Sequence, residues 1–216
     1  MNIVLFGPPA AGKGTQGNNL VKEFNLFKVS TGDLLRSEIN KNSDLGKKIN
    51  SIIQKGDFVP DEMMNNLVIK ILSNKKYFNR LIFDGYPRNL NQAKTLDEMI
   101  KKSNQKISCV LSLNVDKDVI IKRILGRQIC SKCGLIFNKF FNPPNANNHK
   151  CDPTFLKIRS DDNEKTIENR YENYLKETLP ILNFYKNLNL LHEINGMHEI
   201  SKIYEEIRRI IDPLDT

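Results

Sequence analysis

The residues with the clearest chemical potential lie near the start of the chain, in the segment Gly7–Thr15 (GPPAAGKGT). An apolar run precedes this segment and a helical pattern follows it, which is the context of a phosphate-binding loop. Small residues let backbone N–H groups point at a phosphate chain, and the helix N-terminus adds partial positive charge. Lys13 is a mobile cation that can reach the β- and γ-phosphates. The general pattern has Ser or Thr directly after the Lys, whereas here Gly14 intervenes before Thr15.

Three of the cysteines could hold a metal ion. Cys130 and Cys133 have the spacing of half a zinc ribbon, and Cys151 follows after 17 intervening residues. A complete ribbon would place its fourth ligand three residues further on, where this chain has Thr154. Water, Thr154 or the nearby His149 could complete a tetrahedral zinc site on these three thiolates. The alternative is a reduced, metal-free segment.

The pattern along the chain predicts an α/β scaffold for these residues. Five continuous apolar runs are typical of strands buried on both faces, and segments with helical spacing lie between them. The expected strands are Ile3–Phe6, Phe27–Val29, Leu81–Asp84, Cys109–Leu113 and Leu190–Ile194. The expected helices are Gly14–Phe24, Asp61–Leu72, Asn91–Lys101, Lys117–Leu125, Glu164–Tyr185 and Glu199–Ile211. Such alternation indicates a parallel sheet with helices on both faces.

Two stretches interrupt this alternation. Residues 30–59 have helical character and no strand, and residues 127–163 carry the cysteine pair, two adjacent prolines and an Asn-rich turn. We interpret both as insertions on one core formed by residues 1–29, 60–126 and 164–216.

Composition narrows the class of protein. The 216 residues include 33 Lys+Arg and 25 Asp+Glu, a net charge of +8 that suggests an anionic partner. With 39% apolar residues the chain can build one sizeable core and is not disordered. No apolar run approaches the ~20 residues of a membrane span, and the N-terminus lacks the features of a signal peptide. A membrane or secreted protein is disfavoured, and we expect a cytoplasmic one.

Four motifs in this order resemble the adenylate kinase family, in the form with a long lid. They are Gly12–Gln16 (GKGTQ), Ser30–Arg36 (STGDLLR), Phe83–Arg88 (FDGYPR) and Arg159–Asp162 (RSDD). The resemblance runs from residue 2 to about residue 211. It implies a P-loop kinase core with a five-stranded parallel sheet, an AMP-binding insertion at 30–59 and a lid at 127–163. It also implies Mg-dependent, in-line phosphoryl transfer from ATP to AMP, giving two ADP, with lid closure and no protein general base.

The resemblance also assigns residues to the acceptor, AMP. Arg36 would pair with its phosphate, residues 57–59 would hold the adenine, and Gln92 would hydrogen-bond the adenine and reject guanine. Ser30 or Thr31 could instead, or in addition, cap a helix starting at Asp33. The full implied acceptor set is Thr31, Arg36, Asp57, Phe58, Val59, Gly85, Tyr86, Pro87, Arg88, Gln92, Arg159 and Arg170.

Similar assignments follow for the donor, ATP, and for the transfer itself. The implied ATP-binding set is Ala10, Ala11, Gly12, Lys13, Gly14, Thr15, Arg123, Arg127 and Gly196. The implied catalytic set is Lys13, Asp84, Arg88, Arg123, Arg159 and Arg170. Asp84 would hold magnesium through water, and the cations would compensate charge on the phosphate oxygens. Zinc on Cys130, Cys133 and Cys151 would stiffen the lid and take no part in the chemistry.

Two details of the motifs leave alternatives open. Asp161 and Asp162 could orient lid arginines, or they could belong to the start of the next helix, where Asn163-Glu164 could form an N-cap and capping box. Ala10 stands where the family usually has Gly. If the backbone there needs a positive φ, Ala adds strain and weakens phosphate binding, whereas at negative φ nothing is lost.

Three other functions compete with this interpretation. The first is a nucleoside monophosphate kinase preferring UMP, CMP or GMP, against which the long lid and Gln92 argue. The second is a P-loop nucleic-acid-binding module, but the chain has no basic patch interleaved with aromatic residues and no complete zinc ribbon. The third is an inactive relative, which the retained cationic residues disfavour. We therefore expect ATP, AMP and ADP as ligands, no nucleic-acid or membrane partner, and a monomer.

Overall fold

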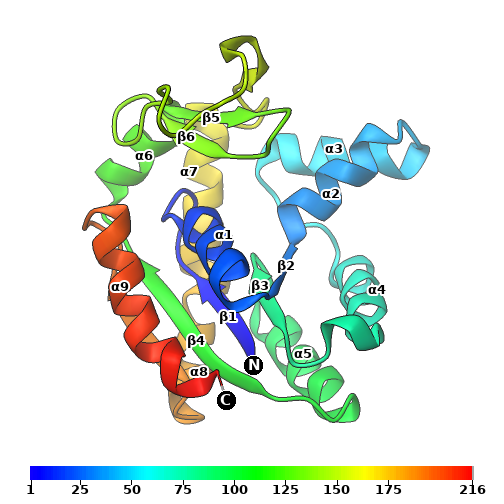
Figure 1. Cartoon of the computed structure of the whole chain (residues 1–216). Coiled ribbons are helices and arrows are strands. Elements are labelled where there is room, and N and C mark those ends of the chain that lie inside the picture. Colours follow the sequence, from blue (N-terminus) through cyan, green and yellow to red (C-terminus); the bar gives the residue numbers. More distant parts are fainter. Residues whose placement is uncertain (216) are drawn as a thin grey trace.

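A five-stranded parallel sheet forms the centre of the computed structural model, which describes residues 1–215 (Figure 1). Its strand order is β2 (Phe27–Ser30), β3 (Leu81–Asp84), β1 (Asn2–Phe6), β4 (Ile107–Asn114) and β8 (Leu191–Asn195). Every neighbouring pair is parallel. The prediction of a parallel α/β core is confirmed. Each expected strand begins and ends within two residues of the bounds of an observed strand.

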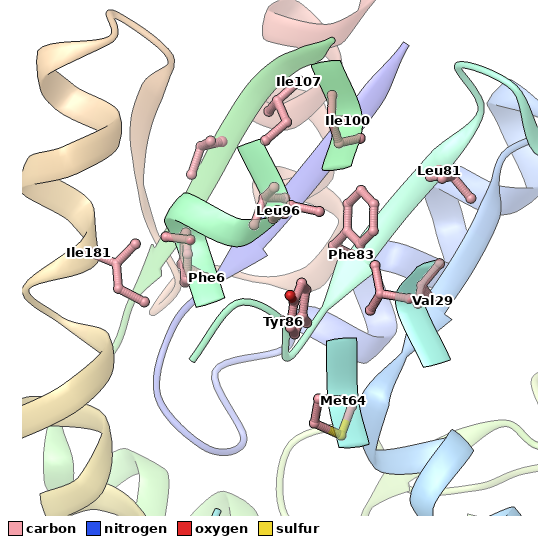
Figure 2. Packing of buried hydrophobic residues seen from close by; sticks show 14 of the residues in the cluster. Phe6, Val29, Met64, Leu81, Phe83, Tyr86, Leu96, Ile100, Ile107 and Ile181 are labelled. Carbon is pink, nitrogen blue, oxygen red and sulfur yellow. The ribbon is translucent and has the colours of Figure 1, made fainter. Parts of the chain in front are cut away.

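Helices cover both faces of the sheet, which explains the continuous apolar runs. In β1, Ile3 and Leu5 face a cluster with α1 (Lys13–Phe24) and α9 (Ile200–Ile211). The alternate residues Val4 and Phe6 face a second cluster, to which α4 (Asp61–Leu72), α5 (Leu90–Lys102) and α8 (Ile181–Asn187) contribute. Figure 2 shows part of this second cluster, where Phe83 of β3 and Leu96 of α5 lie together.

The two interruptions of the alternation form separate structures above the sheet (Figure 1). Between β2 and α4 lie α2 (Thr31–Asn40) and α3 (Asp44–Lys55), at the upper right of the view. After α6 (Lys117–Leu125), a small antiparallel sheet of order β6–β5–β7 forms the top, from β5 (Arg127–Cys130), β6 (Ile136–Asn138) and β7 (Leu156–Lys157). The sequence did not predict these strands, because they are only two to four residues long.

Ser30 caps α2, as one of the two interpretations of this segment predicts. Its Oγ accepts a hydrogen bond from the Asp33 N–H at 3.3 Å, although the helix starts at Thr31. At the next motif the cap is Asn163, whose side chain accepts from the Thr166 N–H at 3.0 Å. The predicted N-cap at Asn163 is therefore confirmed, and neither Asp161 nor Asp162 is itself the cap.

The expected single helix from Glu164 to Tyr185 is also wrong. The structure has α7 (Glu164–Asn173), then a π-helical turn at Tyr174–Thr178, then α8. In the turn the Leu179 N–H donates to the carbonyl of Tyr174, five residues back, and Pro180 follows. The Thr178 hydroxyl donates to the carbonyl of Arg88 at 2.8 Å, so the irregular turn bonds to the loop after β3. Isolated π turns of this kind are frequent at functional sites.

Three short 3₁₀ turns complete the described secondary structure, at Lys75–Tyr77, Pro153–Phe155 and Asp212–Leu214. Within residues 1–215, no helix combines the length and apolar character that crossing a membrane requires.

Candidate active site

A cleft of about 1280 Å³ opens at the carboxyl ends of β1 and β3. This is where open α/β sheets bind ligands. Residues of the core, of the 30–59 segment and of the 127–163 segment all line it. The predicted site residues on its wall are Ala10, Ala11, Gly12, Lys13, Gly14, Thr15, Thr31, Arg36, Asp57, Phe58, Val59, Asp84, Gly85, Pro87, Arg88, Arg123, Arg127, Arg159 and Arg170.

The loop after β1 wraps tightly around the start of α1. Gly7 has φ +141°, and a Cβ there would lie 2.8 Å from the Leu113 carbonyl oxygen, so only glycine fits. Lys13 Nζ donates to the carbonyls of Gly7 at 2.7 Å and Pro8 at 2.9 Å. Burial lowers the pKa of Lys13 to about 8, although the nearby Asp84 carboxylate raises it. A phosphate chain in the loop would supply the negative charge that this ammonium lacks.

Ala10 adopts the left-handed conformation, with φ +57°. The other non-glycine residues at positive φ in residues 1–215 are all asparagines, which tolerate this region. The structure thus decides the question that the sequence left open, and Ala10 is strained. For an L-residue with a Cβ the cost is about 1–2 kcal/mol.

We expect Ala10→Gly to stabilise the protein by up to about 1 kcal/mol, because the Cβ clash that glycine removes outweighs the extra freedom, worth about 0.4–1 kcal/mol, that glycine gives the unfolded chain. For a chain of this size the midpoint of thermal unfolding should rise by about 2–4 °C. Calorimetry would measure this. Ala11→Gly is the matched control, since Ala11 is buried, has no positive φ and should lose stability. Equal destabilisation by both changes would contradict the strain at Ala10.

Arg88 lines the cleft from the loop that follows β3. Its Nε donates to the Gly85 carbonyl at 2.8 Å, and its terminal nitrogen donates to Thr31 Oγ1 at 3.3 Å. The guanidinium carbon is 5.1 Å from the centre of the Phe58 ring. Burial and the neighbouring Arg170 lower the pKa of Arg88 to about 10. These contacts hold the guanidinium in place beside a second cation, Arg170.

Arg127, Arg159 and Arg170 also line the cleft, but only two of them have an anionic partner. Arg127 pairs with Asp162, and Arg170 pairs with Asp161. Both carboxylates thus hold arginine side chains, and their role in orienting the lid arginines stays a prediction. Arg159 has no such pair in residues 1–215, and its Nε is buried without a hydrogen-bond acceptor. Burial and Arg127 lower the pKa of Arg159 to about 10.

Arg159 thus has a buried donor without an acceptor and lies close to other cations. This arrangement is unfavourable unless an anion binds there. Phosphate suits it, because a guanidinium fork matches the geometry of phosphate oxygens.

Two predicted acceptor residues lie outside the main cleft. Tyr86 and Gln92 line a small adjoining pocket of about 10 Å³, together with Gly85 and Arg88. The Gln92 side chain accepts from the Arg88 N–H at 2.8 Å and donates to Asp61 at 2.6 Å. The side-chain amide is thus oriented. Its oxygen can accept one further hydrogen bond, and its NH₂ group can donate one more.

Arg123 bounds the other side of the cleft, near the last strand. It donates to the carbonyl of Gly196 at 2.9 Å and lies 5.7 Å from the centre of the Phe141 ring. Gly196 itself does not line the cleft, although the following Met197 and His198 do.

An apolar part of the cleft wall, which includes Ile136, Phe137 and Phe141, was not predicted from the sequence. The aromatic residues of an otherwise polar segment were the available signal, because such residues often mark a ligand surface.

The cysteines of the upper segment gather with a fourth candidate ligand, His149. The ligand atoms of Cys130, Cys133, His149 and Cys151 all lie within 4.8 Å of one another. His149 is 8% exposed, and its Nε2 has no hydrogen-bond partner. Burial and the other two thiols raise the pKa of Cys151 to about 11. Thr154, the position of the missing ribbon ligand, instead donates its hydroxyl to Asp152 at 2.6 Å.

Comparisons with known proteins agree with the geometry. A family model described as adenylate kinase matches residues 5–190. The chain is 46% identical over 211 residues to an adenylate kinase of Pelagibacter ubique, covering 98% of this chain and 99% of that protein. It is 39% identical over 214 residues to an adenylate kinase of Enterococcus faecalis, with 98% and 99% covered. It is 41% identical over 216 residues to one of Bacillus cytotoxicus, with 99% and 100% covered.

Proposed function

The chain belongs to the adenylate kinase family, and from that premise we propose which of its residues carry the reaction. It is a nucleoside monophosphate kinase that reversibly transfers a phosphoryl group from ATP to AMP, giving two ADP. Magnesium enters with ATP as part of the substrate. The assignment of roles to individual residues is our proposal.

The observation that carries the proposal is the excess of cations at the centre of the cleft. Lys13, Arg88 and Arg170 are close enough for their charges to act on one another, and Asp84 is the carboxylate that acts on Lys13 and Arg88. Arg159 lies beside two further cations, Arg127 and Arg36. Phosphoryl transfer needs in-line placement and compensation of charge more than covalent help from the protein. Calorimetric titration tests this directly, and we expect one AMP site and one MgATP site per chain.

We propose that the donor lies on the P-loop side. The backbone of residues 10–15 and Lys13 would hold the phosphates of ATP, and Arg123, Arg127 and the backbone at Gly196 would flank its base and phosphates. The Asp84 carboxylate suits magnesium, because Mg²⁺ prefers carboxylate, phosphate and water oxygens. A Cβ at Gly14 would lie 4.0 Å from Asp84 Oδ2, so this carboxylate is near the loop that takes the phosphates.

We propose that the acceptor lies between Arg88 and the 30–59 segment. Thr31 and Arg36 would hold AMP and its phosphate, and Arg88 would bridge that phosphate and the transferred group. Arg159 and Arg170 would contact both of these groups. The backbone and side chains of residues 57–59, with Gln92, would hold the adenine. The stretch Gly85–Pro87 would line the same site.

We also propose a separate role for each segment of the chain. Residues 1–29, 60–126 and 164–216 would form the core, residues 30–59 the AMP-binding flap, and residues 127–163 the lid. Ile136 supports an arrangement with the lid over the donor loop, since a Cβ at Gly14 would lie 3.1 Å from its Cδ1. Two flaps over the nucleotides would exclude water, which prevents hydrolysis of ATP.

We also propose a structural zinc ion in the lid, held by Cys130, Cys133, His149 and Cys151. Four ligands of this type within 4.8 Å match the tetrahedral preference of zinc. The unpartnered Nε2 of His149 is the polar atom that a metal would satisfy. Three thiolates this close would repel one another without a cation. Zinc would supply the compensating charge and displace the protons that the thiols still carry.

The zinc proposal predicts about one zinc per chain, measured by atomic absorption on protein purified without chelator. His149→Ala should lose most of the zinc and lower the midpoint of thermal unfolding by about 5 °C or more, since structural zinc stabilises the fold that supplies its ligands. Thr154→Ala is the control and should keep its zinc. Zinc retained at the same affinity in His149→Ala would overturn the ligand set.

We further propose that the enzyme acts as a monomer in the cytoplasm. The residues assigned to both nucleotides come from one chain, and most of them line one cleft, so no second copy is needed to complete the site. Light scattering after gel filtration tests the oligomeric state.

A further inference from the structure

Helix α7 is bonded to the flap by a row of polar side chains. Thr166, Asn169 and Asn173 lie on one face of the helix, at spacings of three and four residues. Each donates to a backbone carbonyl at the end of α3, the carbonyls being those of Gln54, Lys55 and Gly56 in that order. The Thr166 bond is 3.0 Å long and the Asn173 bond is 3.2 Å. We call these three side chains the α7 row.

The α7 row supplies hydrogen-bond donors to the carbonyl groups at the end of α3. The last carbonyls of a helix have no partner within the helix. After α3 the chain turns at Gly56, which has φ +81°. A Cβ on Gly56 would lie 3.0 Å from the Thr166 carbonyl oxygen, so the two backbones approach closely.

The row also connects two parts of the proposed acceptor site. Residues 57–59, which we assign to the adenine of AMP, follow directly after the bonded carbonyls. Asn169 Nδ2 additionally lies 3.1 Å from the Asp57 carboxylate. Arg170, assigned to the phosphate end, is the next residue of the same helix. The base end and the phosphate end of the acceptor site are thus set by one rigid element.

We propose that Asn169 and Asn173 are positioning residues for the acceptor nucleotide, which they serve by holding residues 57–59 at a fixed separation from Arg170. The proposal rests on the acceptor site assigned above. Neither asparagine touches AMP in this account. Without them the flap would spend a smaller fraction of time in the arrangement that binds AMP, and the apparent affinity falls by that fraction.

The test is calorimetric titration and steady-state kinetics of the double variant Asn169→Ala/Asn173→Ala. Two lost hydrogen bonds should raise the Kd and KM for AMP about tenfold. The Kd for MgATP should stay within about twofold, and kcat at saturating AMP should not fall below about half. This split between KM and kcat is the signature of lost uniform binding.

Two further variants separate positioning from packing. The isosteric change Asn169→Asp/Asn173→Asp keeps shape but cannot donate, so it should weaken AMP binding at least as much as alanine. Asn50→Ala, at an exposed position of α3, is the matched control and should bind AMP as the wild type does.

Unchanged AMP affinity in both double variants would overturn the positioning role, as would an equal loss of ATP and AMP affinity. Failure of the wild type to bind AMP would instead refute the acceptor site itself.

Discussion

Replacing Arg88 with alanine is expected to lower kcat about 10³-fold and to raise the KM for AMP. The guanidinium is held by Gly85 and Thr31 and lies beside Arg170, so it stands ready for a phosphate rather than being attached to a carboxylate. A fixed cation that stabilises charge in the transition state is worth about 10²–10⁵ in rate. Coupled spectrophotometric measurement of ADP formation would give both constants.

Two other arginine variants serve as comparisons for this result. Arg88→Lys keeps the charge but loses the two-pronged geometry, so its kcat should lie between those of wild type and alanine. Arg209→Ala, at an exposed position of α9 with no ion pair in residues 1–215, should leave kcat unchanged. If Arg88→Ala folded normally and kept a kcat within tenfold of the wild type, the central role of this residue would be wrong.

Lys13→Ala is expected to lower kcat/KM for MgATP about 10³-fold, because the donor phosphates lose the cation of their loop. A loss of this size corresponds to about 4 kcal/mol of transition-state stabilisation. The matched control is Lys202→Ala, an exposed lysine of α9 that makes no ion pair in the described chain. An intact kcat/KM in Lys13→Ala would show that the loop binds ATP through its backbone alone.

Lys13 also predicts a pH dependence for the wild type. Burial lowers its pKa to about 8 in the free enzyme, and only the protonated form carries charge. The value of kcat/KM for MgATP, which reports groups of the free enzyme, should therefore fall as pH rises through about 8. Bound phosphates would raise this pKa, so kcat should hold to higher pH. In Lys13→Arg the fall should disappear, because arginine stays protonated; a fall that persists there would assign it to another group.

Much of the fold and of the site could be predicted from the sequence because the relevant signals are local. The apolar runs identify strands of a sheet covered on both faces, as the opposite packing of Leu5 and Phe6 illustrates. The P-loop is one continuous segment between a strand and a helix, so its place at the end of β1 follows directly. Asp84 ends a neighbouring parallel strand, which brings it to the same edge of the sheet.

What the sequence could not provide depends on contacts between distant segments. The choice among water, Thr154 and His149 required knowing that the histidine side chain turns toward the cysteines while Thr154 bonds Asp152. The π turn after α7 breaks a pattern that is periodic throughout, and its bond to Arg88 spans 90 residues. Asn169 and Asn173 look like ordinary helix-surface residues until α3 is placed beside them.

The central claim is that this cleft transfers phosphate from ATP to AMP in particular. The most direct measurement incubates the protein with MgATP and AMP, UMP, CMP or GMP in turn, and separates the nucleotides by chromatography. We predict ADP formation with AMP alone, lost in Lys13→Ala and Arg88→Ala. Equal or faster transfer to UMP, CMP or GMP would contradict the acceptor site built around residues 57–59 and Gln92. No transfer to any of them by folded protein would contradict the account as a whole.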